Sequence, residues 1–301
     1  MKICVAAGTT WIDQLSELFP NNIVPTDNVS DGFPKLEDGS CNVLAAEKHD
    51  VGLDTARAEG YTGEFKVGAN LFSKEPLGMV TRDDDDRWSD IVNWVVHALM
   101  AADEQGVTQA TAKAIGPFTA LGEDFETLFV DVIEAVGSYG EIYQRHMEDV
   151  VPRGGLNEIN KGASGLIYSH PFGSLQTEAP YVPESSTLAK IRKRGHLKCG
   201  VSNIPSFSRF DQELSKWVGF DVDYCRAMSA AIFSGDPNRV VFLFSTSAQR
   251  FKDLALGDVD ILSRLTTVTL GRDIRETNSQ TGFTFTRPTY YDGLTYGGVD
   301  E

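Results

Sequence analysis

Short apolar runs alternate with helical stretches along the first part of the chain. Residues 2–7 form a run that is expected to be a buried strand, and residues 11–19 show helical periodicity. Further strand-like runs cover residues 23–24, 42–46 and 65–72. Strands that alternate with single helices are typical of a small parallel, doubly wound sheet, so this pattern predicts an α/β lobe.

The middle of the chain is predicted to be helical, after Pro and Gly interrupt the pattern at residues 73–78. Two apolar stripes, at residues 88–100 and 125–136, repeat every three or four positions. This spacing is typical of the core-facing sides of amphipathic helices. The acidic run at residues 83–86 lacks the spacing of a calcium loop, so we interpret it as the solvated first turn of a helix.

The last part of the chain returns to alternating strands and helices after a polar stretch with several prolines at residues 171–186. We interpret that stretch as a linker. Helices and strands then alternate, beginning with a helix, at residues 187–194, 196–201, 220–233, 240–245, 248–257 and 260–263. A second parallel sheet is therefore expected.

Charge narrows the classes of partner. The formal net charge is −16 and the pI is about 4.7, so the average surface repels nucleic-acid phosphates and anionic lipid headgroups. We therefore expect no nucleic-acid or membrane-surface partner, and a self-repelling monomer. No stretch approaches the roughly 20 apolar residues that cross a bilayer. The first residues lack the features of a signal peptide, so the protein is either cytosolic or has lost its targeting segment.

The four cysteines form no C-x-x-C pair and have no neighbouring histidine, which argues against a metal site. Two interpretations remain: four buried thiols, or two disulfides in an oxidising compartment. If bridges form, we expect Cys4 to pair with Cys41 and Cys199 with Cys225, because each pair falls within one predicted strand and helix neighbourhood. No cofactor motif is present, and no cofactor is expected.

Six short motifs near the end of the chain resemble, in order, the N-terminal portion of bacterial periplasmic amino-acid-binding proteins. These are the solute-binding components of ABC transporters for polar and general L-amino acids. The motifs are LKCGV at 197–201, GFDVD at 219–223, QRF at 249–251, GDVD at 257–260, TTVT with the following arginine at 266–272, and YYDG at 290–293. Residues 1 to about 168 resemble the later portion of the same family, through GTT at 8–10, KEPLG at 74–78, Trp88 and GEIY at 140–143.

The resemblance implies an α/β, two-lobed periplasmic binding protein fold of type II, the Venus-flytrap fold. The family's first motifs come last here, so the chain is expected to be circularly permuted. The expected domains are a small α/β lobe at 1–72, a hinge at 73–77 and a large α/β lobe at 78–296. The large lobe would comprise a mostly helical part at 78–170, a linker joining the family's original termini at 171–186, and a βαβ part at 187–296.

The resemblance also implies a binding site for a free L-amino acid. Arg272, five residues after Thr267, corresponds to the arginine that clamps the ligand α-carboxylate, and Thr267 supplies a hydroxyl. Thr9 and Thr10, which follow Gly8, would present backbone N–H groups and a donor hydroxyl. The alternatives are an exposed arginine at a helix start and an ordinary helix cap.

Four further residues are assigned by the same resemblance. Glu47 would pair with the ligand α-ammonium, unless it is a solvent-facing loop residue. Arg250 would meet a side-chain carboxylate, which mildly favours an acidic or amide ligand. The carbonyl of Leu265 would accept from the ammonium, and Phe207 would wall the side-chain pocket unless it is an ordinary core residue.

These assignments predict an extracytoplasmic protein, periplasmic or extracellular, that closes its two lobes on an L-amino acid and serves an ABC permease. One alternative is a ligand-sensing or interaction module without transport. Another is an enzyme on the same fold, similar to prephenate or arogenate dehydratases. We expect no enzyme and assign no catalytic residue, because the five histidines are scattered and no nucleophile motif is present.

Overall fold

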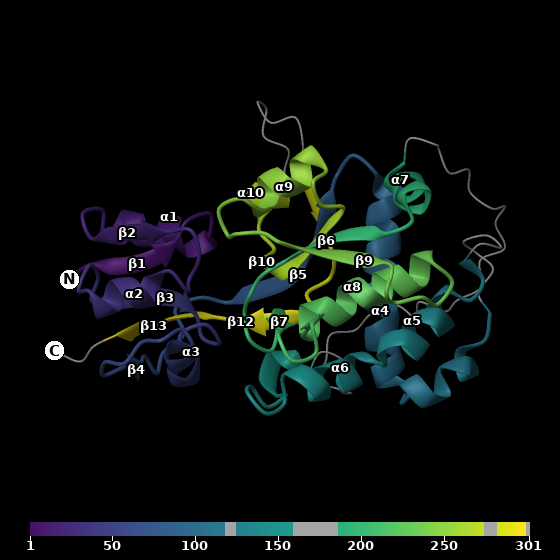
Figure 1. Ribbon diagram of the computed structural model, residues 1–301, viewed down its shortest axis with the longest axis horizontal. Helices are drawn as coiled ribbons and strands as arrows, with labels where there is room; N and C mark the ends of the chain where they lie inside the picture. Colours follow the sequence, from purple (N-terminus) through teal and green to yellow (C-terminus); the bar gives the residue numbers. More distant parts are fainter. Residues whose placement is uncertain (118–124, 159–185, 274–281, 299–301) are drawn as a thin grey trace. The chain divides into compact units, whose positions relative to one another are not determined.

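The computed structural model describes residues 1–117, 125–158, 186–273 and 282–298 (Figure 1). These residues form two compact units. Unit 1 contains Met1–Leu77, Ser245–Asp253 and the residues from Tyr290 on, and unit 2 contains Gly78–Phe244 and Leu254–Thr289. The predicted linker at 171–186 lies outside the described residues except for its last position. No described helix is long and apolar enough to cross a membrane.

Unit 1 is built on a sheet with the strand order β2-β1-β3-β13-β4, whose strands are drawn side by side in Figure 1. Its strands are β1 (Ile3–Ala6), β2 (Ile23–Thr26), β3 (Val43–Glu47), β4 (Lys66–Val67) and β13 (Leu294–Gly298). Its helices are α1 (Thr10–Leu18), α2 (Gly32–Glu37) and α3 (Leu53–Ala58). The strand β1 is buried along its whole length, which suits a central strand with parallel neighbours on both sides.

The sheet of unit 1 differs from the predicted one at its far edge. The expected strand at 65–72 is reduced to β4, and β13 from the end of the chain runs antiparallel between β3 and β4. The neighbouring strand β12 (Tyr290–Asp292) pairs antiparallel with the first residues of β5 (Glu75–Arg82). Residues 290–296 therefore belong to unit 1, whereas the sequence assigned them to the large lobe.

Residues 73–78 were expected to break regular structure and to form a boundary. The boundary between the units does fall there, after Leu77, but the expected break in regular structure is wrong. The strand β5 begins at Glu75 and continues through Pro76 into unit 2. Antiparallel partners lie along it, with Tyr291 opposite Pro76 and Phe285 opposite Val80. Pro and Gly disfavour a strand when only neighbouring residues are considered. The partner strands that stabilise β5 come from more than two hundred positions further along the chain, so the local pattern does not reveal them.

Unit 2 contains a mixed sheet of order β11-β5-β10-β6-β9 rather than a purely parallel one. The strands β6 (Leu197–Val201), β9 (Val240–Phe244) and β10 (Ile261–Thr267) are parallel, as predicted. β11 (Phe283–Phe285) runs antiparallel to β5. A separate hairpin joins β7 (Arg209–Asp211) to β8 (Lys216–Val218).

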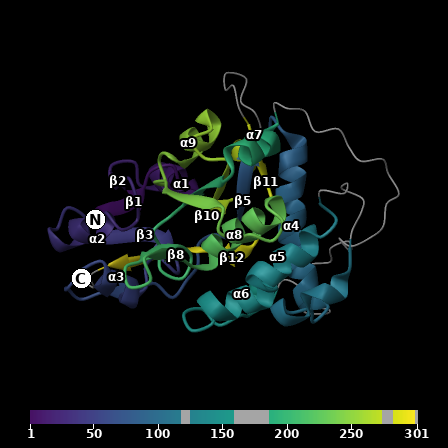
Figure 2. The same cartoon turned by 45° about the vertical axis from the view of Figure 1, so that its right-hand side comes forward.

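Helices account for most of the rest of unit 2, and Figure 2 shows α4, α5, α6 and α8 side by side. The helices are α4 (Asp86–Glu104), α5 (Leu128–Val136), α6 (Tyr139–His146), α7 (Thr187–Arg194), α8 (Phe220–Ile232), α9 (Arg250–Leu256, which begins in unit 1) and α10 (Leu270–Asp273). Short 3-10 helices cover Gln109–Ile115 and Gly155–Asn157. The apolar positions predicted at 88–100 and 125–136 are buried, which confirms both stripes.

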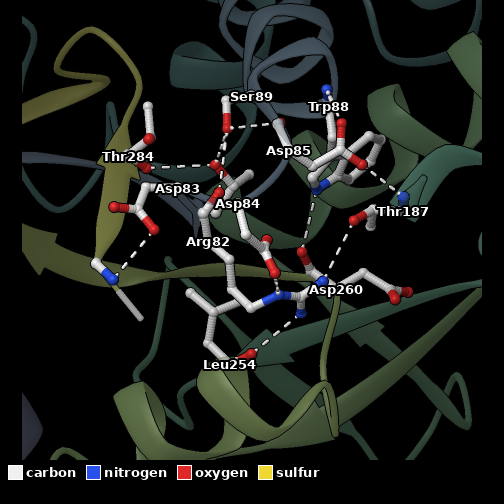
Figure 3. Close-up of polar contacts among 12 residues, drawn as sticks. Arg82, Asp83, Asp84, Asp85, Trp88, Ser89, Thr187, Leu254, Asp260 and Thr284 are labelled. Carbon is white, nitrogen blue, oxygen red and sulfur yellow. Dashed lines mark hydrogen bonds and ion pairs between the residues drawn. The ribbon is translucent and has the colours of Figure 1, made fainter. Parts of the chain in front are cut away.

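The acidic run before α4 is a capping device, as Figure 3 shows. Asp85 accepts hydrogen bonds from the backbone N–H groups of Trp88 at 3.1 Å and Thr187 at 2.5 Å. Asp83 accepts from the N–H of Gly282 at 3.1 Å, and Asp84 pairs with Arg82 at 3.2 Å. The interpretation of this run as a helix start is confirmed. The description of it as solvated is wrong for Asp83 and Asp85, which accept hydrogen bonds from backbone N–H groups.

Both predicted disulfides are present. Cys4 in β1 is bonded to Cys41 just before β3, with Cα atoms 5.7 Å apart. Cys199 in β6 is bonded to Cys225 in α8, with Cα atoms 6.3 Å apart. The alternative of four buried thiols is therefore wrong. Each bridge ties a central strand to a neighbouring element of its own unit.

Candidate functional site

The predicted anion-binding turn lies in unit 1 between β1 and α1. Gly8 has φ +71°, and a Cβ at this position would lie 2.7 Å from the carbonyl oxygen of Ser247, so only glycine fits without strain. Thr9 donates its hydroxyl to the carbonyl of Ala6 at 2.5 Å. Thr10 donates its hydroxyl to Glu75 at 3.1 Å. The hydroxyl proton of Thr10 is thus engaged by a carboxylate, although the sequence analysis gave it to a ligand.

Glu75 is a buried site residue that the sequence analysis missed. Its side chain is 4% exposed, and it also accepts the hydroxyl of Ser73 at 2.5 Å. The Ser73 oxygen in turn accepts the backbone N–H of Leu294 at 3.0 Å. Glu75 lies in the KEPLG motif that was noted as part of a hinge, and nothing local distinguishes a buried glutamate from an exposed one there.

Arg250 lies beside the same turn and is 3% exposed. Its guanidinium donates to the carbonyl of Ser247 at 2.9 Å and to the carbonyl of Gly8 at 3.0 Å. These contacts hold the α9 start against the turn within unit 1. The role expected for Arg250, contact with a ligand side chain, stays a prediction.

Glu47 is the last residue of β3 and is 4% exposed, so the alternative of a solvent-facing loop residue is wrong. Burial disfavours its ionised form, and the neighbouring Asp50 carboxylate acts in the same direction. Together they raise the pKa of Glu47 well above its usual range, although the charge of His49 partly opposes them. Glu47 therefore tends to keep its proton, and a neighbouring cationic group would favour the loss of that proton.

His49 follows Glu47 closely and brings two more carboxylates to this place. One ring nitrogen, Nδ1, contacts Oδ2 of Asp292, and the other, Nε2, lies 3.2 Å from Oδ1 of Asp50. The three side chains are between 3% and 5% exposed. Burial alone would lower the pKa of His49, but the two aspartates outweigh it and raise that pKa well above its usual value.

Among the residues that the structure describes, this cluster is also a place where a metal ion could bind. Donor atoms of Glu47, His49 and Asp50 lie within 4.8 Å of one another. Both ring nitrogens of His49 already face carboxylates, however, and a metal ligand needs one nitrogen lone pair for the ion. We assign an internal ion pair to these contacts, and the expectation of no metal site stays a prediction.

The predicted carboxylate clamp lies in unit 2, at the end of β10. Arg272 on α10 donates to the backbone carbonyl of Thr267 at 2.8 Å and is half-buried. Leu265 has φ +53°, a left-handed conformation that costs energy for a branched side chain and is common at binding sites. As the alternative proposed, Arg272 lies in a short helix directly after a strand, but it is half-buried rather than exposed. Its role as the carboxylate clamp stays a prediction.

Phe207 lies in the core of unit 2. It is 1% exposed and packs edge-on against Phe220, with ring centroids 5.9 Å apart. This placement agrees with the alternative of an ordinary core phenylalanine. A role as a pocket wall stays a prediction.

Curated relatives share sequence with this chain over part of its length. The general L-amino acid-binding periplasmic protein AapJ of Rhizobium johnstonii is 39% identical over 110 residues, which cover 36% of this chain and 30% of that protein. The putative amino-acid ABC transporter-binding protein YhdW of Escherichia coli is 43% identical over 110 residues, with the same coverage. The glutamate/glutamine/aspartate/asparagine-binding protein BztA of Rhodobacter capsulatus is 30% identical over 194 residues, which cover 56% of this chain and 57% of that protein.

Solved structures with sequence similarity cover a smaller share. A periplasmic binding protein from Brucella ovis with glutathione bound is 44% identical over 29% of this chain and 27% of its own, with a TM-score of 0.28. The cysteine-binding protein from Campylobacter jejuni is 30% identical over 29% of this chain and 34% of its own, with a TM-score of 0.27. No family model matches the chain.

The structure is α/β, and the relatives that share sequence with this chain are named as binding proteins. The homologues of this chain are periplasmic amino-acid-binding proteins of ABC transporters, and they are named for binding rather than for catalysis. The chain spans about a third of the length of the first two relatives and 57% of the third.

Proposed function

We propose that this protein captures a free L-amino acid outside the cytoplasm and serves an ABC permease. The observation that supports this most is the placement of opposite charges. Unit 1 holds the buried Glu47 among other carboxylates, and unit 2 holds Arg272 next to Thr267. An amino-acid zwitterion needs an anion for its ammonium group and a bidentate cation for its carboxylate.

Lobe closure is part of this proposal. A ligand held by Arg272 and Thr267 and also by Thr10 and Glu47 would bind best to a conformation in which both sets reach it. Such a ligand shifts the population toward that closed conformation. Because Thr10 donates to Glu75, its oxygen is left as an acceptor, so the backbone N–H groups of its turn would serve the ligand instead.

The remaining predicted contacts belong to the same proposal. The left-handed Leu265 turns its peptide units away from the regular strand direction, which suits a carbonyl that accepts from an ammonium group. Arg250 would influence ligand choice through the Gly8 turn that it holds, and through a side-chain carboxylate if its guanidinium is released. Phe207 would support the pocket from the core.

A thermal-shift screen against the twenty L-amino acids tests the proposed function, with the matching D-amino acids as controls. A ligand at 100 times its dissociation constant stabilises the native state by about 2.7 kcal/mol, which is readily detected. We expect shifts with L-amino acids and none with their D-enantiomers. Shifts confined to Glu, Gln, Asp and Asn would support a role for Arg250. A shift only with prephenate or arogenate would instead support an enzyme.

Transport is distinguished from sensing by uptake. Cells that produce the protein together with its permease should accumulate the labelled ligand faster than cells lacking the binding protein. Equal uptake in both, with tight binding in vitro, would favour a sensing module. The periplasmic or extracellular location and the monomeric state belong to the same proposal and are tested by cell fractionation and by sedimentation.

We also propose that the order of the two parts is permuted relative to the relatives. Support comes from β12 and β13, which end the chain yet pair with β5 and β3 from its first part. A reordered chain that starts at residue 187, joins 301 to 1 through a Gly-Ser linker and ends at 170 should fold and bind the same ligand. A reordered chain that fails to fold, while the present one folds, would contradict the permutation.

A further inference from the structure

The pairing of strands in unit 1 brings together three carboxylates, those of Asp292, Glu75 and Glu47. Asp292 on β12 lies opposite Glu75 on β5, and Leu294 on β13 lies opposite Glu47 on β3. The segment after β3 adds His49 and Asp50, whose donor atoms lie within 4.8 Å of that of Glu47. Four carboxylates and one imidazole thus form a cluster in which side chains are at most 5% exposed, and two of the carboxylates, Asp50 and Asp292, contact the imidazole.

The contacts of His49 favour its protonated form. Nδ1 contacts Asp292 and Nε2 lies 3.2 Å from Asp50, so a carboxylate faces each ring nitrogen. A neutral imidazole would turn a lone pair toward one of these carboxylates, whereas an imidazolium donates on both sides. The geometry is therefore that of a buried cation held between two anions.

The same contacts fix the backbone that carries Glu47. Lys48 donates its N–H to the carbonyl of Gly293 at 3.0 Å, and Gly293 donates to Oδ1 of Asp292 at 2.8 Å. Thr55 from α3 donates to the carbonyl of His49 at 3.2 Å. The segment after β3 is consequently fastened to the β12 end on one side and to α3 on the other.

We propose that His49 is a positioning residue: a fixed internal cation that holds Glu47 in place and favours the loss of its proton when the ammonium group of a ligand arrives. This inference rests on the proposed function, because it assigns a purpose to Glu47 in ligand capture. His49 itself touches no ligand in this account. Its charge offsets part of the repulsion among the surrounding carboxylates.

The groups that face this cluster set its pH dependence. They are Glu47 from β3, Asp50 from the same segment, Asp292 from β12, and Glu75 from β5, while the ring of Tyr290 stands edge-on to His49 with centroids 6.4 Å apart. Burial and three of these carboxylates raise the pKa of Glu47, and the His49 charge lowers it. Ammonium binding therefore releases a proton wherever ligand-free Glu47 is protonated, so affinity rises with pH.

The first test needs no ligand. The ring signals of histidines labelled with ¹³C are followed by NMR against pH in the full chain, and the His49→Gln variant assigns the His49 signal. We expect His49 to titrate above the ordinary value of about 6.5 and to shift downward in Asp292→Asn. Titration of His49 at or below the ordinary value would overturn the proposal. Should His49→Gln fail to fold, the Asp292→Asn comparison carries the same test.

The second test measures the dissociation constant of L-glutamine, whose side chain is uncharged, across pH. His49→Gln should bind about tenfold more weakly for each unit by which the pKa of Glu47 rises, and its affinity should increase only at higher pH than in the natural protein. His49→Lys should restore the natural profile, and His196→Gln in unit 2 serves as the matched control.

The outcomes separate the two proposals. Glutamine binding with the same pH profile in His49→Gln as in the natural protein would overturn the role of His49 and leave the proposed function standing. Failure of the natural protein to bind any of the twenty L-amino acids would overturn the proposed function, and with it the purpose assigned to Glu47.

Discussion

Arg272 carries the proposed recognition of the ligand carboxylate. Its guanidinium donates to the carbonyl of Thr267 at 2.8 Å, and a guanidinium is the group best suited to bidentate contact with a carboxylate. Arg272→Ala should weaken amino-acid binding by about 2–5 kcal/mol, because a carboxylate would then lose its cationic partner. Isothermal titration calorimetry measures the change.

A matched control for this variant is Arg239→Ala. Arg239 is half-exposed, pairs with Asp236 at 3.2 Å and has no proposed role. We expect Arg239→Ala to bind like the natural protein. Equal affinity of Arg272→Ala and Arg239→Ala would remove Arg272 from the site.

His97 predicts an acid-sensitive stability at the residue scale. It is 1% exposed on α4 and stacks on Trp94, and burial together with the charge of Arg287 lowers its pKa to about 4. The unfolded chain has an ordinary histidine pKa of about 6.5 and takes up the proton first as the pH falls. The contribution of His97 is therefore fully present above about pH 6.5 and is lost progressively toward about pH 4.

Replacing His97 with Leu should flatten this dependence. Urea unfolding across that pH window measures it, with His196→Gln as the control. Parallel loss of stability in the natural protein and in His97→Leu would contradict the assignment of acid sensitivity to this residue.

Single residues were predictable where a motif or resemblance marks them, and their surroundings were not. Glu47 and Arg272 were assigned from sequence as residues that bind the ligand. The structure defines their contacts within the protein, and their roles in binding remain proposals. Glu75 and His49 were missed, because their partners Thr10 and Asp292 come from distant segments. A charged residue just after or before a strand was the only local signal.

The disulfide of unit 1 connects two elements, and its contribution to stability can be tested. It joins β1 to the segment before β3 across 37 positions, within a sheet whose other strands are short. The paired variant Cys4→Ser with Cys41→Ser should lose about 2–4 kcal/mol of unfolding free energy, because the unfolded chain gains freedom. Denaturant unfolding measures this loss, and a stability equal to that of the natural protein would contradict a structural role for the bridge.

Local patterns predicted elements well where burial is continuous or helically periodic. The core strand β1 and the helix α4 were both expected from short windows, since each buries the residues that its period places inside. The strands β5, β12 and β13 were missed or misplaced. Each of these strands is stabilised by antiparallel neighbours that are distant in sequence. In addition, Pro76 and Gly78 lie within β5 and are residues typical of turns.

At the scale of the whole molecule, the sequence predicted two α/β parts but not their membership. Residues 245–253 and those from Tyr290 on cluster with unit 1, although they lie far from it in sequence. The order of elements along the chain does not show which unit a segment joins. That assignment depends on tertiary contacts such as that of Arg250 with Gly8. Each of the two disulfides lies within one unit.

Lobe closure is the prediction that belongs to this scale. Small-angle X-ray scattering should show a smaller radius of gyration with a saturating amino acid than without it, because the ligand favours a closed conformation. The Arg272→Ala variant at the same ligand concentration should show no such decrease. An unchanged radius for the natural protein, with ligand demonstrably bound, would contradict closure.

The most direct test of the central claim is a calorimetric titration of the natural protein with the L-amino acids, beginning with glutamine and glutamate. We predict saturable binding of one ligand per chain. Binding should be absent with the D-enantiomer, and it should be weaker when Glu47 or Arg272 is replaced by a neutral residue. No saturable heat with any of the twenty, from protein that unfolds cooperatively, would contradict the claim that this protein captures a free amino acid.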